Sequence, residues 1–259
     1  MKTQFHFSAG NSKLKKTAKL LSEFRGEKYK IFSFSLPAPD TCPYAGACSA
    51  ICYAQQGHYR HKPAMRVRQH NLDLVKSFSL KALIDALNED IGILKKSTKA
   101  KIVIRLHDSG DFSSEIYVYA WLFVAMNNPD VEFYAYTKSA RLLPRHMINN
   151  EVENVTICCS FGGKDDAYIV TDLVGLLSGV IVSRIFPVTP TGPKGKLLPE
   201  DTARAHAEMR ESGYVDGNSD EYGDLTLLLG NVPRIGLVYH GTKKMTSPQV
   251  KALTWSKEA

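Results

Sequence analysis

The sequence predicts a single α/β domain that spans residues 1–259 and is built on a parallel sheet. Short β-rich runs alternate with stretches that carry apolar residues three and four apart, the patterns of strands and of amphipathic helices. Such alternation favours a parallel sheet with helices outside it. We count about six strands, whereas a closed barrel needs eight. We therefore expect a partial or irregular (β/α) TIM-like barrel.

The elements are expected in a regular order along the chain. The first strand, 31–36, ends at Pro37, and helices over about 63–78 and 80–94 follow it. Ser114 can cap a helix over 115–127, in which the aromatic residues at 117, 119, 121 and 123 are expected to serve helix packing. The remaining strands are expected at 101–106, 131–136, 155–159, 180–185 and 235–239, and the remaining helices at 141–148, 165–177 and 200–212.

Positive charge is concentrated in two parts of the sequence. Lys and Arg outnumber Asp and Glu by 33 to 26, which gives a net charge of +7. The excess lies in a basic N-terminal segment, about residues 1–30, and in a block formed by Arg60, Lys62, Arg66 and Arg68. Such patches attract phosphate-rich partners, here nucleic acid or a nucleotide. A solvated, solubilising surface is the alternative.

Three features predict a protein of a reducing compartment. The chain has no run of about 18 apolar residues, and Met1 is not followed by the apolar segment of a signal peptide. Its five cysteines are an odd number, which argues against a disulfide framework. We therefore expect a cytoplasmic protein without a membrane partner.

Three of the cysteines lie in one loop, at about residues 38–58. Cys42, Cys48 and Cys52 have the spacing C-x5-C-x3-C, which lets one loop surround a single centre with three thiolates. No histidine completes the set locally, and the spacing differs from the close pairs typical of zinc sites. The loop therefore predicts an iron–sulfur cluster, of the [4Fe-4S] type. Zinc is the alternative metal, and three buried thiols without a metal are the remaining alternative.

The other two cysteines, Cys158 and Cys159, are adjacent on an expected strand, so their side chains point to opposite faces of the sheet. If the inward one reaches the cluster, four thiolates close the site, and Cys159 is the candidate fourth ligand. If neither does, the site stays open. An open site favours catalysis, and a closed site favours structure or electron transfer.

Polar residues follow the next strands. In α/β folds chemistry collects at the carboxyl ends of parallel strands, so four strand ends are expected to converge. Asp108, Ser109, Gly110 and Asp111 could bind ammonium or hydroxyl groups, or form a polar turn in which Asp caps the next helix. Lys138 suits an anionic group, and Lys138 and Asp108 are the catalytic candidates. His107 is expected to be a core histidine, and the weaker candidates are Tyr134, Tyr136, Ser139, Arg184 and His240.

Several blocks of the sequence together resemble a known family. They are Gly10 to Leu14, Phe32 to Pro37, Thr41 to Pro43, Cys48, Cys52 to Ala54, His107 to Phe112 and Phe133 to Ser139. In this combination they resemble the phage and plasmid family labelled gene product 88. The resemblance runs from about residue 10 to 163 and implies a protein of a mobile element in the host cytoplasm.

The cysteine loop and the strand order also resemble those of radical S-adenosylmethionine enzymes. That resemblance implies that Cys42, Cys48 and Cys52 hold the cluster and that Ser109-Gly110-Asp111 contacts S-adenosylmethionine. The usual spacing in those enzymes is C-x3-C-x2-C, from which this chain departs. The resemblance implies a radical enzyme, and the basic patches favour a nucleic acid or a nucleotide as its substrate.

Two other functions stay open at this point. The first is a non-catalytic nucleic-acid-binding module that an iron–sulfur cluster or zinc stabilises. The second is a base-exchange enzyme, because residues 108–112 resemble the Asp-Ser-Gly-Gly-Phe signature of queuine-type barrels. Those barrels carry a zinc cluster near the C-terminus, which this sequence lacks.

Overall fold

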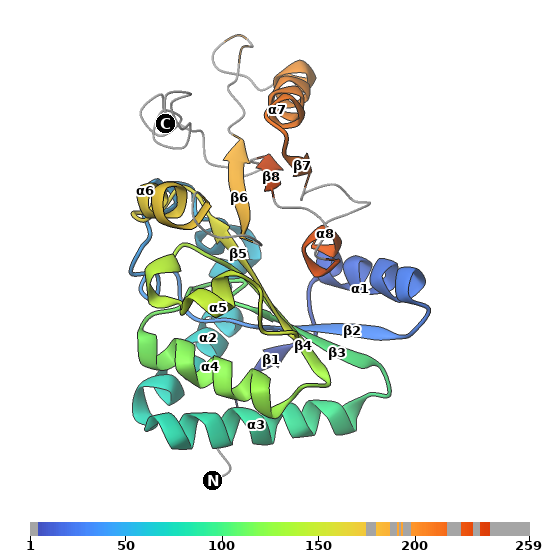
Figure 1. Ribbon diagram of the computed structural model, residues 1–259, viewed down its shortest axis with the longest axis vertical. Helices are drawn as coiled ribbons and strands as arrows, with labels where there is room; N and C mark the ends of the chain where they lie inside the picture. Colours follow the sequence, from blue (N-terminus) through green and yellow to red (C-terminus); the bar gives the residue numbers. More distant parts are fainter. Residues whose placement is uncertain are drawn as a thin grey trace.

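The structure is a computed structural model that describes residues 5–174, 180–186, 191, 193, 198–216, 224–229 and 234–238. Its strands form one sheet in the order β1-β2-β3-β4-β5-β6-β8-β7, and all neighbours are parallel except β1 and β2 (Figure 1). The strands are β1 (Phe7–Ser8), β2 (Tyr29–Phe34), β3 (Lys101–Leu106), β4 (Val131–Thr137), β5 (Val155–Ser160), β6 (Ile181–Phe186), β7 (Val215–Asp216) and β8 (Arg234–Val238).

Helices and short helical turns connect these strands. The α-helices are α1 (Ser12–Arg25), α2 (Lys62–Ser77), α3 (Leu80–Ser97), α4 (Glu115–Asn127), α5 (Arg145–Ile148), α6 (Asp166–Tyr168), α7 (Pro199–Glu211) and α8 (Leu225–Leu228). The 3-10 turns are η1 (Ala47–Ile51), η2 (Tyr53–Gln55), η3 (Gly57–Arg60) and η4 (Ala140–Leu142), and η5 (Ile169–Val174) is π-helical. No helix in the described ranges combines the length and the apolar character needed to cross a bilayer.

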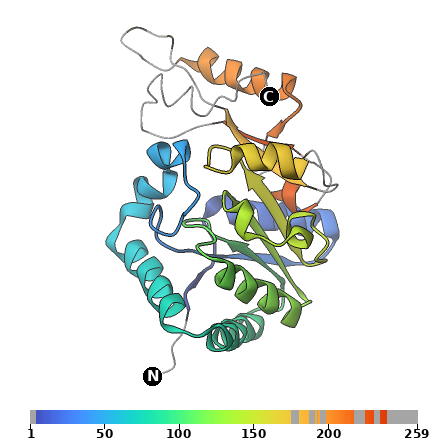
Figure 2. The same cartoon turned by 60° about the vertical axis from the view of Figure 1, so that its left-hand side comes forward.

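Helices cover both faces of the sheet. Side chains alternate between the faces along each strand, so Ile104 packs in one apolar cluster with Trp121 of α4, and Val103 packs in another with Leu14 of α1 and Leu225 of α8. Figure 1 shows α3 and α4 on one side of β2 and β3 and α1 on the other, and Figure 2 shows the same layers after rotation. The core is thus two apolar layers that one sheet separates.

The predicted parallel α/β sheet is confirmed, but the TIM-like barrel is not. The described strands form an open sheet with β1 and β7 at its two ends. In a barrel the inner face is filled by the side chains of the strands themselves. Here α1 and α8 cover that face instead, through Leu14, Leu21 and Leu228. The helices that fill this face occupy the space into which a barrel would close.

Local signals located most of the elements. Strand β3 and helix α4 have the predicted bounds, and the hydroxyl of Ser114 accepts the N–H of Tyr117 as an N-cap. The predicted helix at 141–148 is instead split into η4 and α5. The predicted helix at 165–177 is helical over 166–174, as α6 followed by the π-helical η5, and residues 175–177 lie outside the described residues. Helix α1 was not predicted, although Asn11 caps its start and Gly26, at φ 71°, ends it.

The aromatic residues of α4 do not all pack inward. Tyr117 and Trp121 are buried, whereas Tyr119 and Phe123 are each 42% exposed. The prediction that all four serve helix packing is therefore wrong for these two. Residues two apart point to different sides of a helix with 3.6 residues per turn, so a row spaced by two cannot face one layer.

Asp90 of α3 makes stability depend on pH. It accepts the N–H of Phe5 at 2.6 Å, and burial raises its pKa from 3.8 to about 6. Between these values the folded state holds a proton that the unfolded state has released, so stability falls as the pH rises. We expect Asp90 to reduce the unfolding free energy by up to about 3 kcal/mol between about pH 4 and 7.

The test compares urea unfolding of the wild type and Asp90→Asn across this range. The asparagine side chain keeps an acceptor for the Phe5 N–H but does not titrate in this range. The wild type should therefore lose stability relative to the variant as the pH rises. A difference that stays constant with pH would contradict the assignment.

Candidate functional site

The cysteine loop lies across the carboxyl ends of the central strands. The N–H of Cys48 donates to the carbonyl of Gly162 at 3.1 Å, and the N–H of Lys164 donates to the carbonyl of Tyr44 at 2.9 Å, which joins the loop to the segment after β5. The N–H of Leu36 donates to the carbonyl of Ser109 at 2.9 Å and joins the segments after β2 and β3. The structure thus brings together the polar residues that follow separate strands.

Two glycines allow the loop to pack this closely. A Cβ atom on Gly46 would lie 2.8 Å from the carbonyl carbon of Gly163, and a Cβ atom on Gly163 would lie 2.8 Å from the carbonyl oxygen of Tyr44. Both contacts are with backbone, which cannot move aside as a flexible side chain can. Gly46 and Gly163 therefore fix the position of the cysteine loop on the sheet edge.

The three loop cysteines are free, half-buried and close enough to affect one another's ionisation. Burial raises the pKa of the Cys42 thiol to about 12; Asp111, Cys52 and Cys48 act in the same direction, and Lys138 opposes them. Burial also raises the pKa of Cys52, while backbone N–H groups of Ala54 and Gln55 that donate to it act to lower the pKa. These N–H groups and Lys138 would stabilise thiolates.

The described side chains do not form a site for a single ion. Across the described ranges, no group of three or more His, Cys, Asp or Glu side chains is placed to hold a metal ion. A tetrahedral zinc site needs ligands that converge at about 2.0–2.3 Å from one point. The described part of the loop therefore presents no ligand set that fits zinc or another single metal ion.

Cys158 and Cys159 point to opposite faces of the sheet, as predicted. Cys158 packs with Tyr134 and Ile181 on the face that α1 and α8 cover. Cys159 lies in the other apolar layer with Ile157. Burial raises the pKa of its thiol, and the charges of Cys158, Asp111 and Asp165 act in the same direction. The role of Cys159 as a fourth ligand stays a prediction, and its position among apolar side chains is typical of a packing residue.

Asp111 ties the end of β3 to the end of β4. Its buried carboxylate accepts the hydroxyl of Thr137 at 2.6 Å and the backbone N–H groups of Lys138 at 2.9 Å and Phe112 at 2.8 Å. These three bonds act to lower its pKa, but burial has the larger effect and raises it. Asp111 does not cap α4, because Ser114 does so.

Ser109 and Gly110 also make contacts within the protein that stabilise the turn after β3. The hydroxyl of Ser109 donates to the carbonyl of Leu36 at 2.9 Å and accepts from Arg68 at 3.1 Å. Gly110 has φ 83°, and a Cβ atom there would lie 2.6 Å from the hydroxyl oxygen of Thr41. The side chains of Ser109 and Asp111 therefore hold the strand ends together, as the polar-turn alternative predicts.

Asp108 holds the segment that follows the cysteine loop. Its carboxylate accepts the hydroxyls of Ser35 and Tyr59, the latter at 3.1 Å, and its backbone carbonyl accepts the hydroxyl of Tyr53. His107 is buried, pairs with the hydroxyl of Tyr117 at 2.9 Å, and has its pKa lowered by burial to about 3. It is the neutral core histidine that was expected.

The sequence did not indicate a second polar network, on the face that α1 and α8 cover. Asp224 accepts from Arg105 at 2.9 Å and from Tyr134 at 2.8 Å, and the ammonium of Lys13 lies 3.7 Å from its other oxygen. Tyr136 completes the set at 3.4 Å. Arg105 could have been singled out from the sequence, because it is a charged residue among the apolar residues of β3. No local feature of the sequence singles out Asp224.

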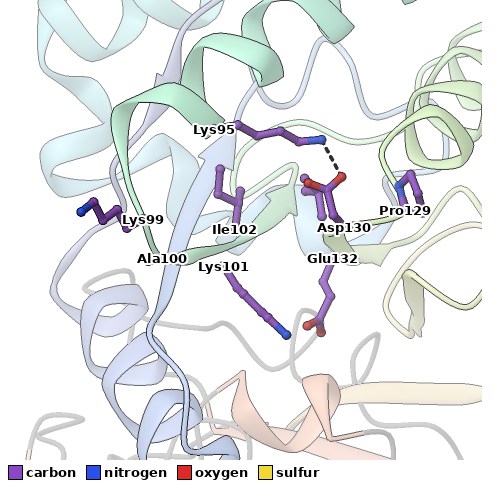
Figure 3. Close-up of a pocket in the computed structure, with 9 residues that line it drawn as sticks. Lys95, Lys99, Ala100, Lys101, Ile102, Pro129, Asp130 and Glu132 are labelled. Carbon is purple, nitrogen blue, oxygen red and sulfur yellow. Dashed lines mark hydrogen bonds and ion pairs between the residues drawn. The ribbon is translucent and has the colours of Figure 1, made fainter.

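The remaining candidates lie elsewhere. Arg184 stacks on the ring of Phe186, with 5.4 Å between its guanidinium carbon and the ring centroid, and His240 lies outside the described residues. A pocket with a volume of about 400 Å³ lies at the amino ends of β3 and β4, and Figure 3 shows the residues that line it. Lys95 pairs there with Asp130 at 2.6 Å. This pocket is at the edge of the sheet opposite to the cysteine loop and is not part of the predicted site.

Comparisons with known proteins identify phage relatives. A family model described as Gene product 88 matches residues 5–227. The Gene 88 protein of Mycobacterium phage L5 is 37% identical over 112 residues, and that of Mycobacterium phage D29 is 35% identical over 112 residues. Each alignment covers 41% of this chain and 47% of the relative, so the chain spans about half the length of these relatives. No solved structure matches significantly.

Proposed function

This chain belongs to the Gene product 88 family, and we propose that it binds a [4Fe-4S] cluster on Cys42, Cys48 and Cys52 and uses it in radical S-adenosylmethionine chemistry. One observation carries the proposal. Three free thiols of a single loop lie together at the carboxyl edge of a parallel sheet, close enough to influence each other's ionisation. That edge is where α/β proteins place their chemistry. The host cytoplasm is the compartment that suits such a cluster.

The donor set fits a cluster better than a zinc ion. Clusters are held by thiolates, and hydrogen bonds to their sulfurs adjust them; Ala54 and Gln55 already donate to Cys52. The positive charge of Lys138 favours the thiolates of Cys42 and Cys52. A cluster is larger than one ion, so its ligands stand farther apart. The wide spacing of the three cysteines along the sequence, C-x5-C-x3-C, suits the larger group.

Three thiolates would leave one position of the cluster for an outside ligand. The apolar surroundings of Cys159 support a site without a fourth protein thiolate. The resemblance to radical S-adenosylmethionine enzymes implies S-adenosylmethionine as this outside ligand. The sequential order of β2 to β6 in the sheet supports that resemblance. The side chains of Ser109 and Asp111 would not contact S-adenosylmethionine themselves, since they already form hydrogen bonds within the protein and hold the turn in place. The turn would offer its backbone.

Protein residues would have defined tasks in this chemistry. A cluster held by Cys42, Cys48 and Cys52 would supply the one-electron reductive cleavage of S-adenosylmethionine, with the electron coming from an external one-electron reductant. Lys138 would balance the charge of the thiolates and attract an anionic substrate group. Asp108 would act as a positioning residue, because its carboxylate already holds Tyr59 and Ser35. Gly46 and Gly163 would keep the loop in place.

Metal and sulfide analysis of protein purified and reconstituted without oxygen tests the cluster. We expect about four irons and about four sulfides per chain, with a brown absorption band. Zinc without sulfide would overturn the choice of metal. S-adenosylmethionine should change the electron spin resonance spectrum of the reduced cluster; an unchanged spectrum would overturn the catalytic part of the proposal.

A second candidate is a non-catalytic nucleic-acid-binding module with the same cluster. The observation that favours it is the use of Ser109 and Asp111 as structural groups. Retained nucleic-acid binding without cleavage of S-adenosylmethionine would select this candidate. The base-exchange alternative stays a prediction that no described contact favours.

A further inference from the structure

We propose that a single-stranded nucleic acid binds to the surface formed by the exposed side chains of Tyr53, Arg60, Lys62, Met65, Arg66 and Val67. We call this set the entry surface. It begins beside Cys52 and continues over η3 onto the first turns of α2. The inference names the substrate class of the cysteine-loop site and in that respect rests on the proposed function.

The entry surface carries three positive charges, and the stretch of sequence that supplies them contains no acid. Arg60, Lys62 and Arg66 are exposed, and within the described part of the chain no ion pair involves them. Residues 56–72 contain no Asp or Glu. The nearest acid along the chain, Asp73, accepts from Gln69 at 2.8 Å. Cations without internal partners bind phosphates with a gain from counterion release.

The cations form a row and not a point. Lys62 and Arg66 are four residues apart on α2, which separates them by about 6 Å along the helix axis, and Arg60 precedes them in η3. Such a row matches the repeated charges of a phosphate backbone better than the compact charge of a nucleotide. This geometry favours a polymer as the ligand.

Tyr53 supplies the contact that favours a single strand. Tyr53 is 50% exposed as a residue, its ring packs edge-on against Tyr59 with the ring centroids 5.4 Å apart, and its hydroxyl donates to the carbonyl of Asp108. The ring is thus held firmly while much of it remains open to solvent. Bases of a single strand stack on exposed aromatic rings, whereas the bases of a duplex are already stacked on each other. Tyr53 directly follows Cys52, so a base stacked there would lie beside the cysteine loop.

Arg68 connects the entry surface to the sheet edge. Although it belongs to the same basic block, it is buried, and it donates to the hydroxyl of Ser109 at 3.1 Å and to the carbonyl of Tyr59. Its guanidinium carbon also lies 5.4 Å from the centroid of the Tyr59 ring. Arg68 therefore holds Tyr59 and α2 against the turn after β3. A strand bound to α2 would have a fixed position relative to the cysteine loop.

Fluorescence anisotropy with a labelled oligothymidine of about 12 nucleotides tests the proposal on anaerobically reconstituted protein. The double variant Lys62→Glu/Arg66→Glu should bind at least about tenfold more weakly, and the magnitude of the slope of log K against log salt should fall by about 1.4, because each lost contact with a single strand removes about 0.7. The matched control, Lys96→Glu/Lys99→Glu, makes the same charge change on exposed lysines near the opposite edge. It should stay within about threefold of the wild type.

Tyr53 variants separate stacking from charge. Tyr53→Leu should weaken binding by about tenfold or more, whereas Tyr53→Phe, which keeps the ring, should bind like the wild type. Equal losses from both double variants would show that only net charge matters and would overturn the assigned surface. A duplex that binds as tightly as the single strand, or no binding at all, would equally overturn it.

Iron content measured in the same samples separates this inference from the proposed function. If the wild-type protein holds the cluster but does not bind the oligonucleotide, the entry surface is contradicted and the cluster proposal is unaffected. Protein that binds the oligonucleotide through Tyr53 and α2 but never takes up iron would keep the surface and remove the cluster.

Discussion

Alanine in place of Cys42, Cys48 or Cys52 is expected to reduce the iron bound after anaerobic reconstitution from about four per chain to below about one. Each thiol would supply one of only three protein ligands, and a cluster with two remaining thiolates is open to solvent and to loss of iron. The three cysteines are half-buried in a loop whose regular structure is limited to short 3-10 turns. Their substitution should therefore leave the unfolding transition of the cluster-free protein nearly unchanged.

Cys158→Ala and Cys159→Ala are the matched controls, because both remove a thiol from strand β5, outside the loop. We expect both to retain the cluster, with a modest loss of stability from the small cavities that they create. Iron and sulfide analysis, with circular dichroism to verify folding, makes the comparison. Loss of iron in Cys159→Ala equal to that in Cys52→Ala would instead identify Cys159 as the fourth ligand and the site as closed.

Asp224→Ala is expected to lower the free energy of unfolding by about 3–5 kcal/mol. The variant would leave the guanidinium of Arg105, which is only 13% exposed, without its anionic partner. It would also remove the acceptor for the hydroxyls of Tyr134 and Tyr136. The pKa of Asp224 is lowered even though burial acts to raise it, because Arg105 and Lys13 favour the charged carboxylate.

Two further variants make this measurement specific. Asp85→Ala breaks the exposed pair with Lys81 and should cost no more than about 1 kcal/mol. Arg105→Met/Asp224→Leu replaces both buried charges by apolar groups and should recover much of the stability lost in Asp224→Ala. Urea unfolding followed by circular dichroism measures all four proteins. If Asp224→Ala costs no more than Asp85→Ala, the network does not stabilise the fold.

The sequence by itself determined the order of the central strands β2 to β6 and of most helices between them, and it placed polar residues at the ends of these strands. Hydrophobic periodicity is a local property, so it located β3 and α4 at the bounds the structure has. Alternation along a strand likewise required Cys158 and Cys159 to face opposite sides. The spacing of Cys42, Cys48 and Cys52 singled out a loop that the structure does place at the carboxyl edge, next to Gly162.

Only the tertiary structure decided which polar side chains form their hydrogen bonds and ion pairs within the protein. Ser109 and Asp111 have the composition of a ligand-binding turn, yet their partners, Arg68 and Thr137, are 41 and 26 residues away in the sequence. Asp224 meets Arg105 across 119 residues. Hydrogen bonds and ion pairs act through space, and their partners are fixed only once the sheet and its helices have packed. Tertiary packing likewise decided that the sheet stays open. The apolar side chains of α1 and α8 pack on one face of the sheet, and the local sequence does not reveal this contact.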